Sequence, residues 1–150
     1  MHIGELINNR GVVRITAKRK IEALEEVIEV LARRREVTSK DAFRRAIKDR
    51  EKILSTGIGF GIAIPHAKIA QVKQFCAAIG ISKEGIPFNA LDGKPVHIMV
   101  MIASPDHQHD EYLRILAQIT HTLKDEETRK RIIDSTDIKS VISIFSEIDY

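Results

Sequence analysis

Two apolar stretches without alternation constrain the fold of this 150-residue chain most strongly. They are FCAAIGI at 75–81 and VHIMVMIA at 96–103. A strand with one wet face alternates apolar and polar residues, whereas a strand buried on both faces is apolar throughout. Neither run approaches the roughly 20 apolar residues of a membrane-spanning helix. We therefore predict two central strands of a sheet that is covered on both sides.

Amphipathic segments around these strands provide the covering helices. Apolar residues recur at helical spacing over about 18–35, 38–54 and 113–123, and shorter patterns follow at 125–133 and from 136. In the second segment, Thr38 or Ser39 is placed to cap the helix and Leu54 continues its apolar stripe. This order predicts an α/β fold, a single mixed β-sheet flanked by helices on both faces, with residues 1–150 forming one domain.

Cysteine content and the first residues indicate the compartment. Cys76 is the single cysteine, which excludes an internal disulfide framework and fits a reducing environment. The opening MHIGELINNRGVV lacks a charged region followed by a long apolar core, so we expect no signal peptide. We predict a cytoplasmic protein without membrane insertion.

The first third of the chain is basic, which raises the question of a nucleic-acid partner. Residues 10–52 hold 14 Lys and Arg against 8 Asp and Glu. The charges alternate in sign along helical stretches, as on a solvated helix face, and aromatic residues do not interleave with them. We therefore predict no nucleic-acid partner.

The chemistry concentrates in the segment REKILSTGIGFGIAIPHAK at 50–68. Arg50 follows Ile47 by three residues, so the spacing aims it inward, where it needs an ion pair or a bound anion. A glycine-rich run with open backbone N–H groups favours phosphate oxygens, although such a run is weak evidence alone. The residues of this expected phosphate loop are Thr56, Gly57, Gly59 and Gly61.

Pro65-His66 is the second feature of this segment. Proline fixes its own φ and favours an extended residue before it, so the strand should stop there with the next side chain held in place. A neutral imidazole nitrogen takes up a phosphoryl group reversibly. Beside a glycine-rich loop and an inward arginine, we interpret His66 as a phosphoryl acceptor rather than a histidine that merely ends a strand.

These residues resemble a known motif. STGIGFGIAIPHA, preceded by RE, is similar to the active-site motif of the type-2 EIIA domains of the bacterial phosphoenolpyruvate-dependent phosphotransferase system. GIPFNALDGKPVHIMVMIASP and LRILAQITHTLKDEETRKRI also have the look of that family. The resemblance implies a mixed sheet flanked by helices. It further implies His66 as the phosphorylated residue, on its tele nitrogen Nε2, Arg50 beside it, and phosphorylated HPr or an HPr-like protein as the donor.

One position departs from the family pattern. Where the family usually has a second active-site histidine, this chain has Tyr112. Its hydroxyl can donate one hydrogen bond to a phosphate or a ring nitrogen, but it cannot become a cation near pH 7. His107 and His109 in the preceding loop are candidates for the missing group.

The same D-H-x-H-D loop permits a rival interpretation as a zinc site, with Asp106 or Asp110 adding a carboxylate. All these ligands are local, which makes the signal weak, and we predict neither a metal nor another cofactor. Within the family, a single domain of this length resembles the nitrogen-regulatory branch. The alternative is a free-standing fructose- or mannitol-class EIIA that passes its phosphoryl group to EIIB, so the further partner is either EIIB or a regulatory target.

Overall fold

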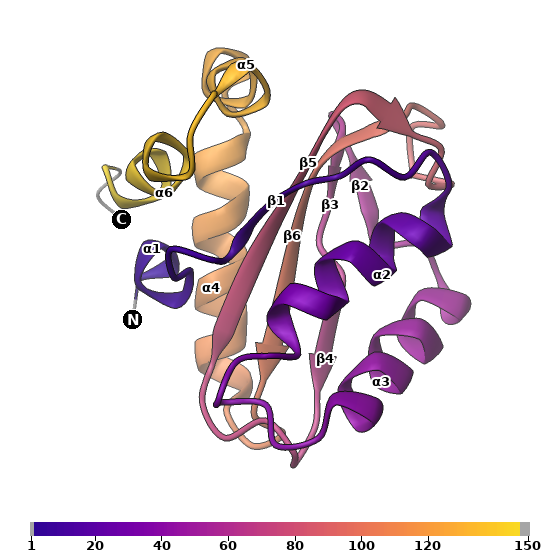
Figure 1. Cartoon of the computed structure of the whole chain (residues 1–150), viewed down its shortest axis with the longest axis vertical. Coiled ribbons are helices and arrows are strands. Elements are labelled where there is room, and N and C mark those ends of the chain that lie inside the picture. Colours follow the sequence, from indigo (N-terminus) through magenta and orange to yellow (C-terminus); the bar gives the residue numbers. More distant parts are fainter. Residues whose placement is uncertain (1, 148–150) are drawn as a thin grey trace.

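The computed structural model describes residues 2–147 and shows a mixed sheet between two layers of helices (Figure 1). The helices are α1 Ile3–Leu6, α2 Lys20–Leu31, α3 Lys40–Ile53, α4 His109–Leu123, α5 Glu126–Asp134 and α6 Ile138–Ser146. The strands are β1 Val12–Arg14, β2 Gly57–Gly59, β3 Ile62–Ala63, β4 His66–Lys68, β5 Cys76–Ile86 and β6 Val96–Ser104. Within these residues, no helix is long and apolar enough to cross a membrane.

The two predicted strands, β5 and β6, form the antiparallel centre of the sheet. The strand order is β1-β5-β6-β3-β2, and β4 pairs with β6 beyond the end of β3. β1 runs parallel to β5, β3 and β4 run parallel to β6, and β2 is antiparallel to β3. The prediction of a single mixed sheet is confirmed.

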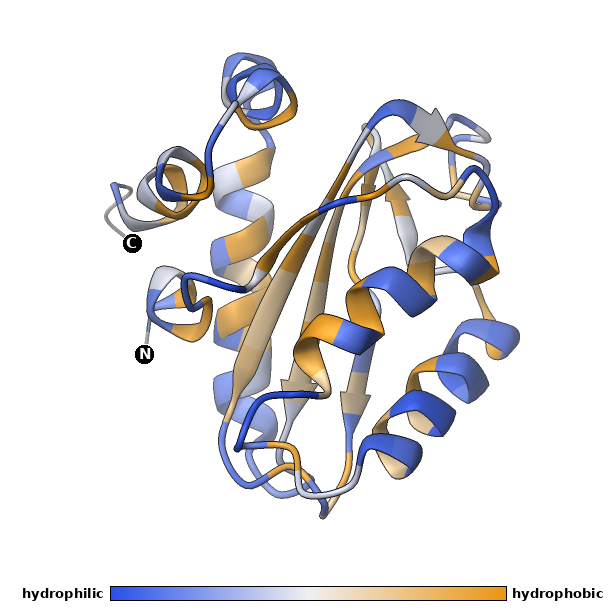
Figure 2. Ribbon diagram, viewed as in Figure 1, coloured by the Kyte–Doolittle hydropathy of each residue, from blue (hydrophilic) through white to orange (hydrophobic). Residues whose placement is uncertain are grey.

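Burial on both faces explains why β5 is apolar without alternation over residues 76–81. Cys76 and Ala78 face the core under α2 and α3, whereas Ala77 and Ile79 face the core under α1, α4, α5 and α6. All four are fully buried. The colouring of Figure 2 agrees, because the long strands are apolar over most of their length and turn hydrophilic only toward one end, whereas the helices carry both hydrophilic and hydrophobic residues. The predicted helices on both faces are therefore confirmed.

α3 carries the segment that leads to His66, and its end differs from the prediction. Ser39 caps it, because its hydroxyl accepts from the N–H of Ala42 at 3.2 Å. The helix ends at Ile53, and Leu54 is extended and 61% exposed. The prediction that Leu54 continues the apolar stripe is wrong, because the chain has left the helix before this residue.

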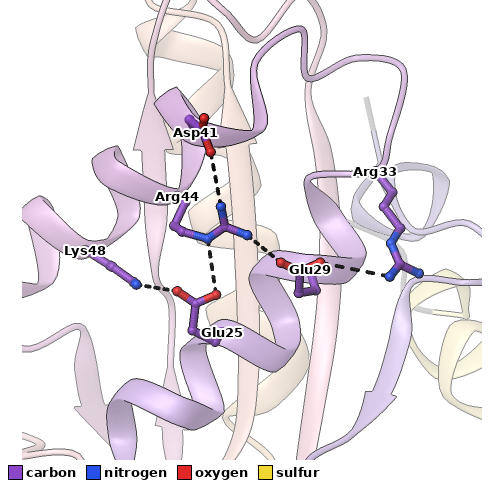
Figure 3. Close-up of polar contacts among 6 residues, drawn as sticks. All are labelled: Glu25, Glu29, Arg33, Asp41, Arg44 and Lys48. Carbon is purple, nitrogen blue, oxygen red and sulfur yellow. Dashed lines mark hydrogen bonds and ion pairs between the residues drawn. The ribbon is translucent and has the colours of Figure 1, made fainter.

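Ion pairs join α2 to α3 on their outer sides (Figure 3). The cluster contains six charged side chains: Glu25, Glu29, Arg33, Asp41, Arg44 and Lys48. Arg44 binds Glu25 at 3.2 Å and also binds Glu29, and Lys48 binds Glu25. The pKa of Glu25 is lowered because these hydrogen-bonded cations outweigh the cost of its burial. Two of the basic side chains of α3, Arg44 and Lys48, are therefore neutralised by carboxylates of α2.

Candidate active site

Pro65 interrupts the edge of the sheet and places His66 at the start of a new strand. β3 ends at Ala63 and β4 begins at His66, and both run parallel to β6. The carbonyl of Pro65 accepts from the N–H of Ile102 at 3.0 Å, so the interruption is itself fixed. The predicted stop of the strand before Pro65-His66 is confirmed, but the sequence did not predict that pairing resumes at His66 opposite Ile102.

One hydrogen bond sets the tautomer of the His66 ring. Nδ1 lies 3.0 Å from the carbonyl oxygen of Ile64. A carbonyl oxygen only accepts, so Nδ1 carries the hydrogen and the lone pair lies on Nε2. The ring is half-buried. Nε2 is therefore the nucleophilic atom of this side chain.

The surroundings of His66 favour its neutral form. The pKa of His66 is lowered, first by burial of the ring and then by the positive charges of Arg50 and Lys68. The hydrogen bond to Ile64 and the carboxylate of Glu51 act in the opposite direction without reversing the shift. The ring is accordingly more often unprotonated near neutral pH than a free histidine is.

Arg50 lies beside His66 but not on the buried stripe of α3. The buried positions of this helix are Phe43, Ile47 and Glu51, so the inward position falls one residue after Arg50. Arg50 is half-buried, and its Nη1 donates to the carbonyl of Leu54 at 2.8 Å. Across residues 2–147 no carboxylate pairs with it, which removes the structural ion pair as an explanation. Its guanidinium keeps donors for an anion at His66.

Glu51 is a residue of the site that was not predicted from the sequence. Its carboxylate is buried, with Lys20 Nζ at 2.9 Å. Thr56 gives it both donors, the N–H at 2.9 Å and the hydroxyl at 2.7 Å. Thr56 therefore connects the end of α3 to β2. Its two donors are bound to Glu51, whereas the sequence predicted that Thr56 belongs to a phosphate loop. The sequence does carry a signal for the burial of Glu51, because it follows the buried Ile47 by four residues, about one helical turn.

The glycine-rich run shapes a hairpin turn. The φ angles of Gly59, Phe60 and Gly61 are 98°, 57° and 76°, which is left-handed backbone that glycine adopts without strain. The N–H of Phe60 donates to Asp92 Oδ2 at 3.1 Å. The N–H of Gly57 donates to the hydroxyl of Ser55 at 3.1 Å. These two amides therefore bind protein groups and are not held open for a ligand.

This turn also lies away from His66. Along β6, the hairpin pairs near Ile98 and His66 pairs with Ile102. Four strand residues span roughly 13 Å. The structure does not support the expectation that Gly57, Gly59 and Gly61 cradle a phosphoryl group at His66. Turn geometry accounts for Gly59 and Gly61, and the close approach of Ala90 accounts for Gly57.

Tyr112 packs its ring against His66. The ring centroids are 5.3 Å apart, and Tyr112 is 6% exposed. Burial raises the pKa of Tyr112 to about 12, although the charge of Arg50 opposes the shift. Within residues 2–147 its hydroxyl forms no hydrogen bond with another side chain or the backbone. The contact is therefore made by the ring face, and the expected hydroxyl donor is not engaged in this state.

The two loop histidines, His107 and His109, have different surroundings. Lys68 Nζ lies 2.7 Å from His109 Nδ1, at the start of α4, so His109 joins the surroundings of His66. His107 instead contacts its neighbour Asp106 at 3.2 Å and is exposed. Residues 2–147 contain no group of three His, Cys, Asp or Glu side chains placed to hold a metal ion. The zinc interpretation of this loop has no structural support.

Replacement of Tyr112 by phenylalanine is expected to change phosphoryl uptake by less than about three-fold. The ring contact with His66 remains, and the hydroxyl has no partner to lose, whereas breaking a hydrogen bond to a charged group would cost roughly ten- to a hundred-fold. Rates of phosphorylation of the parent and of Tyr112→Phe decide this. A ten-fold loss would show that the hydroxyl binds the phosphoryl group once it is present.

A pH dependence follows from the lowered pKa of His66. The unfolded chain binds this proton near pH 6.5, whereas the folded protein binds it only at lower pH. His66 therefore destabilises the fold as the pH falls through and below about 6.5. The free energy of unfolding of the parent should fall relative to that of His66→Gln between pH 7.5 and pH 5, roughly the range of this titration. An equal pH dependence of the two proteins contradicts the shift.

Comparison with known proteins points to one family. The model described as "Phosphoenolpyruvate-dependent sugar phosphotransferase system, EIIA 2" matches residues 5–148. A fructose-specific EIIABC component from Bacillus subtilis is 35% identical over 99% of this chain, which spans 24% of that relative's length. A fructose-specific EIIA component from Haloferax volcanii is 32% identical over 84% of this chain and 82% of its own length. The solved structure of the nitrogen regulatory protein IIA-Ntr from Neisseria meningitidis has a TM-score of 0.88 at 28% identity, covering 95% of this chain and 98% of that chain.

Proposed function

Because this chain belongs to the EIIA 2 family of the phosphoenolpyruvate-dependent phosphotransferase system, we propose that it carries the phosphoryl group on Nε2 of His66. The observation that carries the assignment is the hydrogen bond from Nδ1 to Ile64, which leaves the lone pair on Nε2. The charge of Arg50 acts at the same ring. Residues 1–150 would then act as one phosphocarrier domain in the cytoplasm, without a bound cofactor.

The transfer step needs little beyond positioning and charge. The Nε2 lone pair attacks the phosphorus of a phosphohistidine on an HPr-like donor. The new N–P bond forms as the donor's N–P bond breaks, and the bonding pair stays with the donor ring. The proton on Nδ1 does not move, and its hydrogen bond to Ile64 stabilises the positive charge that develops on the His66 ring. Arg50 binds the phosphoryl oxygens during transfer.

Incubation of the protein with phosphoenolpyruvate, Enzyme I and HPr tests this proposal. One acid-labile phosphoryl group is expected per chain, and peptide mapping should place it on His66. Phosphorus NMR should identify it as attached to Nε2. Stable labelling on a serine or threonine, or attachment at Nδ1, would contradict the assignment.

We propose a regulatory output for this phosphorylation, with a target protein that distinguishes the two states. The likeness to IIA-Ntr supports this, since that structure covers almost the whole chain. A second candidate is a sugar-specific EIIA that passes its phosphoryl group to EIIB. The two fructose-specific relatives, at 35% and 32% identity, favour it.

Transfer to EIIB separates the two outputs. The phosphorylated protein is mixed with EIIB proteins of the fructose and mannitol classes, and loss of label from His66 is followed. Under the regulatory proposal the label stays on His66 when EIIB is added. Rapid transfer to one EIIB would instead establish the transport role.

A further inference from the structure

Lys68 lies on the same side of β4 as His66. Residues two apart on a strand point to one face, and Ala67 between them points into the core under α2 and α3. His66 and Lys68 are both half-buried, and they pair with Ile102 and Ser104 of β6. The ammonium group is therefore delivered by the same rigid strand that delivers the imidazole.

Two side chains of α4 hold that ammonium group. His109 Nδ1 is 2.7 Å from Lys68 Nζ, and because an ammonium only donates, His109 accepts there. Nζ also lies 5.0 Å from the centre of the Tyr112 ring, within the range of a cation–π contact. That ring in turn contacts His66. His109 and Tyr112 thus hold the Lys68 ammonium beside the same ring that contacts His66.

The positive charge of Lys68 is not neutralised by a carboxylate among the described residues. Its partner His109 accepts a hydrogen bond from one of the three N–H groups of the ammonium, so the other two remain available to an anion. A phosphoryl group on His66 brings up to about two negative charges. Tyr112 supplies no positive charge, because a phenol is neutral when it is protonated and negative when it is not. Lys68 is the second positive charge, after Arg50, that acts on the His66 ring, so it is placed to meet this negative charge.

We propose that Lys68 is a further catalytic residue, which binds an oxygen of the phosphoryl group on His66 opposite Arg50, and that His109 is its positioning residue. This inference rests on the proposed function of His66. During transfer Lys68 stays an ammonium and gives up no proton. It neutralises charge on the phosphoryl oxygens while the N–P bond to His66 forms and the donor's N–P bond breaks.

Phosphorus NMR of the phosphorylated protein tests the contact without any partner. A nearby cation favours the dianion, so it lowers the pH at which the phosphoryl group loses its second proton. In Lys68→Gln this midpoint should rise by roughly one unit or more. Lys68→Arg keeps the charge and should stay within about half a unit of the parent. A midpoint unchanged in Lys68→Gln overturns the proposal.

Transfer rates give the second readout. Phosphoryl uptake from phosphorylated HPr should be about ten- to a hundred-fold slower in Lys68→Gln, as for loss of a charge-assisted hydrogen bond. Lys73→Gln is the matched control, since Lys73 is an exposed lysine whose ammonium donates to the carbonyl of Ala70. Its rate should equal that of the parent. If parent and Lys68→Gln are labelled on His66 equally fast, Lys68 has no role but the phosphocarrier assignment stands; if the parent takes up no label, the assignment itself fails.

A double-mutant cycle tests the role of His109. His109→Ala should lose part of the rate that Lys68→Gln loses, and His109→Gln, which keeps an acceptor, should restore much of it. Combined with Lys68→Gln, the change His109→Ala should cause no further loss, because it acts only through Lys68. Additive losses would overturn this positioning role.

Discussion

Replacing His66 by alanine is expected to abolish phosphoryl uptake from phosphorylated HPr. The change removes Nε2, the one atom at this site whose lone pair is both free and fixed in direction by the bond from Nδ1 to Ile64. His109 is no substitute, because its Nδ1 accepts from Lys68 and its ring lies at an exposed helix start. Radiolabelled phosphoenolpyruvate with Enzyme I and HPr measures the uptake, and the residual signal should equal that of a reaction without the protein.

His97→Ala is the matched control for this experiment. His97 is also half-buried, and its Nδ1 also bonds a backbone carbonyl, that of Ser82 at 2.9 Å. It lies at the hairpin end of β6, away from His66. This variant should be labelled as fully as the parent. Equal labelling of His66→Ala and the parent, or label mapped to His109, would show that the acceptor has been misidentified.

The architecture was predictable because burial leaves a direct trace in the sequence. The runs around Ile79 and Val100 are apolar without alternation, and only a strand covered on both faces needs that. The helix periodicities predicted the segments that form α2 to α6, whereas the four-residue α1 is too short to show a period and was not predicted. The interruption at Pro65 was also visible, but the resumption of β4 was not, because it depends on pairing with β6 far along the chain.

The glycine-rich loop shows where local inference fails. A glycine serves a close ligand and a tight turn by the same freedom of φ, and sequence does not distinguish the two. Gly59 and Gly61 prove to serve the turn at Phe60. Likewise a helical stripe locates a residue only to within one position, which is why Arg50 was placed inward although Glu51 holds that site.

Lys68 and His109 were missed as a pair for a different reason. They are 41 residues apart, and their contact exists only because α4 begins against β4. The spacing His66-x-Lys68 was nonetheless visible in the sequence, and once His66 opens a strand it places both side chains on one face. At Tyr112 the sequence suggested a role for the hydroxyl, whereas in the structure it is the ring that contacts His66 and Lys68.

Replacing Arg50 by alanine is expected to slow phosphoryl uptake by about a hundred- to a thousand-fold, as for loss of a group that stabilises charge in a transition state. Its positive charge helps to lower the pKa of His66 and opposes the rise in the pKa of Tyr112, and no carboxylate within residues 2–147 competes for it. Arg50→Lys keeps the charge but loses the planar fork, so we expect a loss of roughly ten-fold or more. Rapid-quench measurement with phosphorylated HPr gives both rates.

The fold should survive these changes, because the hydrogen bond of Arg50 to the exposed carbonyl of Leu54 is worth only about 0.5–1.5 kcal/mol. Arg45→Ala is the matched control, since Arg45 is an exposed arginine on the same helix, five residues earlier. Its transfer rate and melting temperature should both equal those of the parent. Arg50 would be a structural residue if Arg50→Ala unfolded the protein at ordinary temperature, or if it transferred as fast as Arg45→Ala. A normal melting curve with slow transfer, by contrast, places its effect on the phosphoryl group.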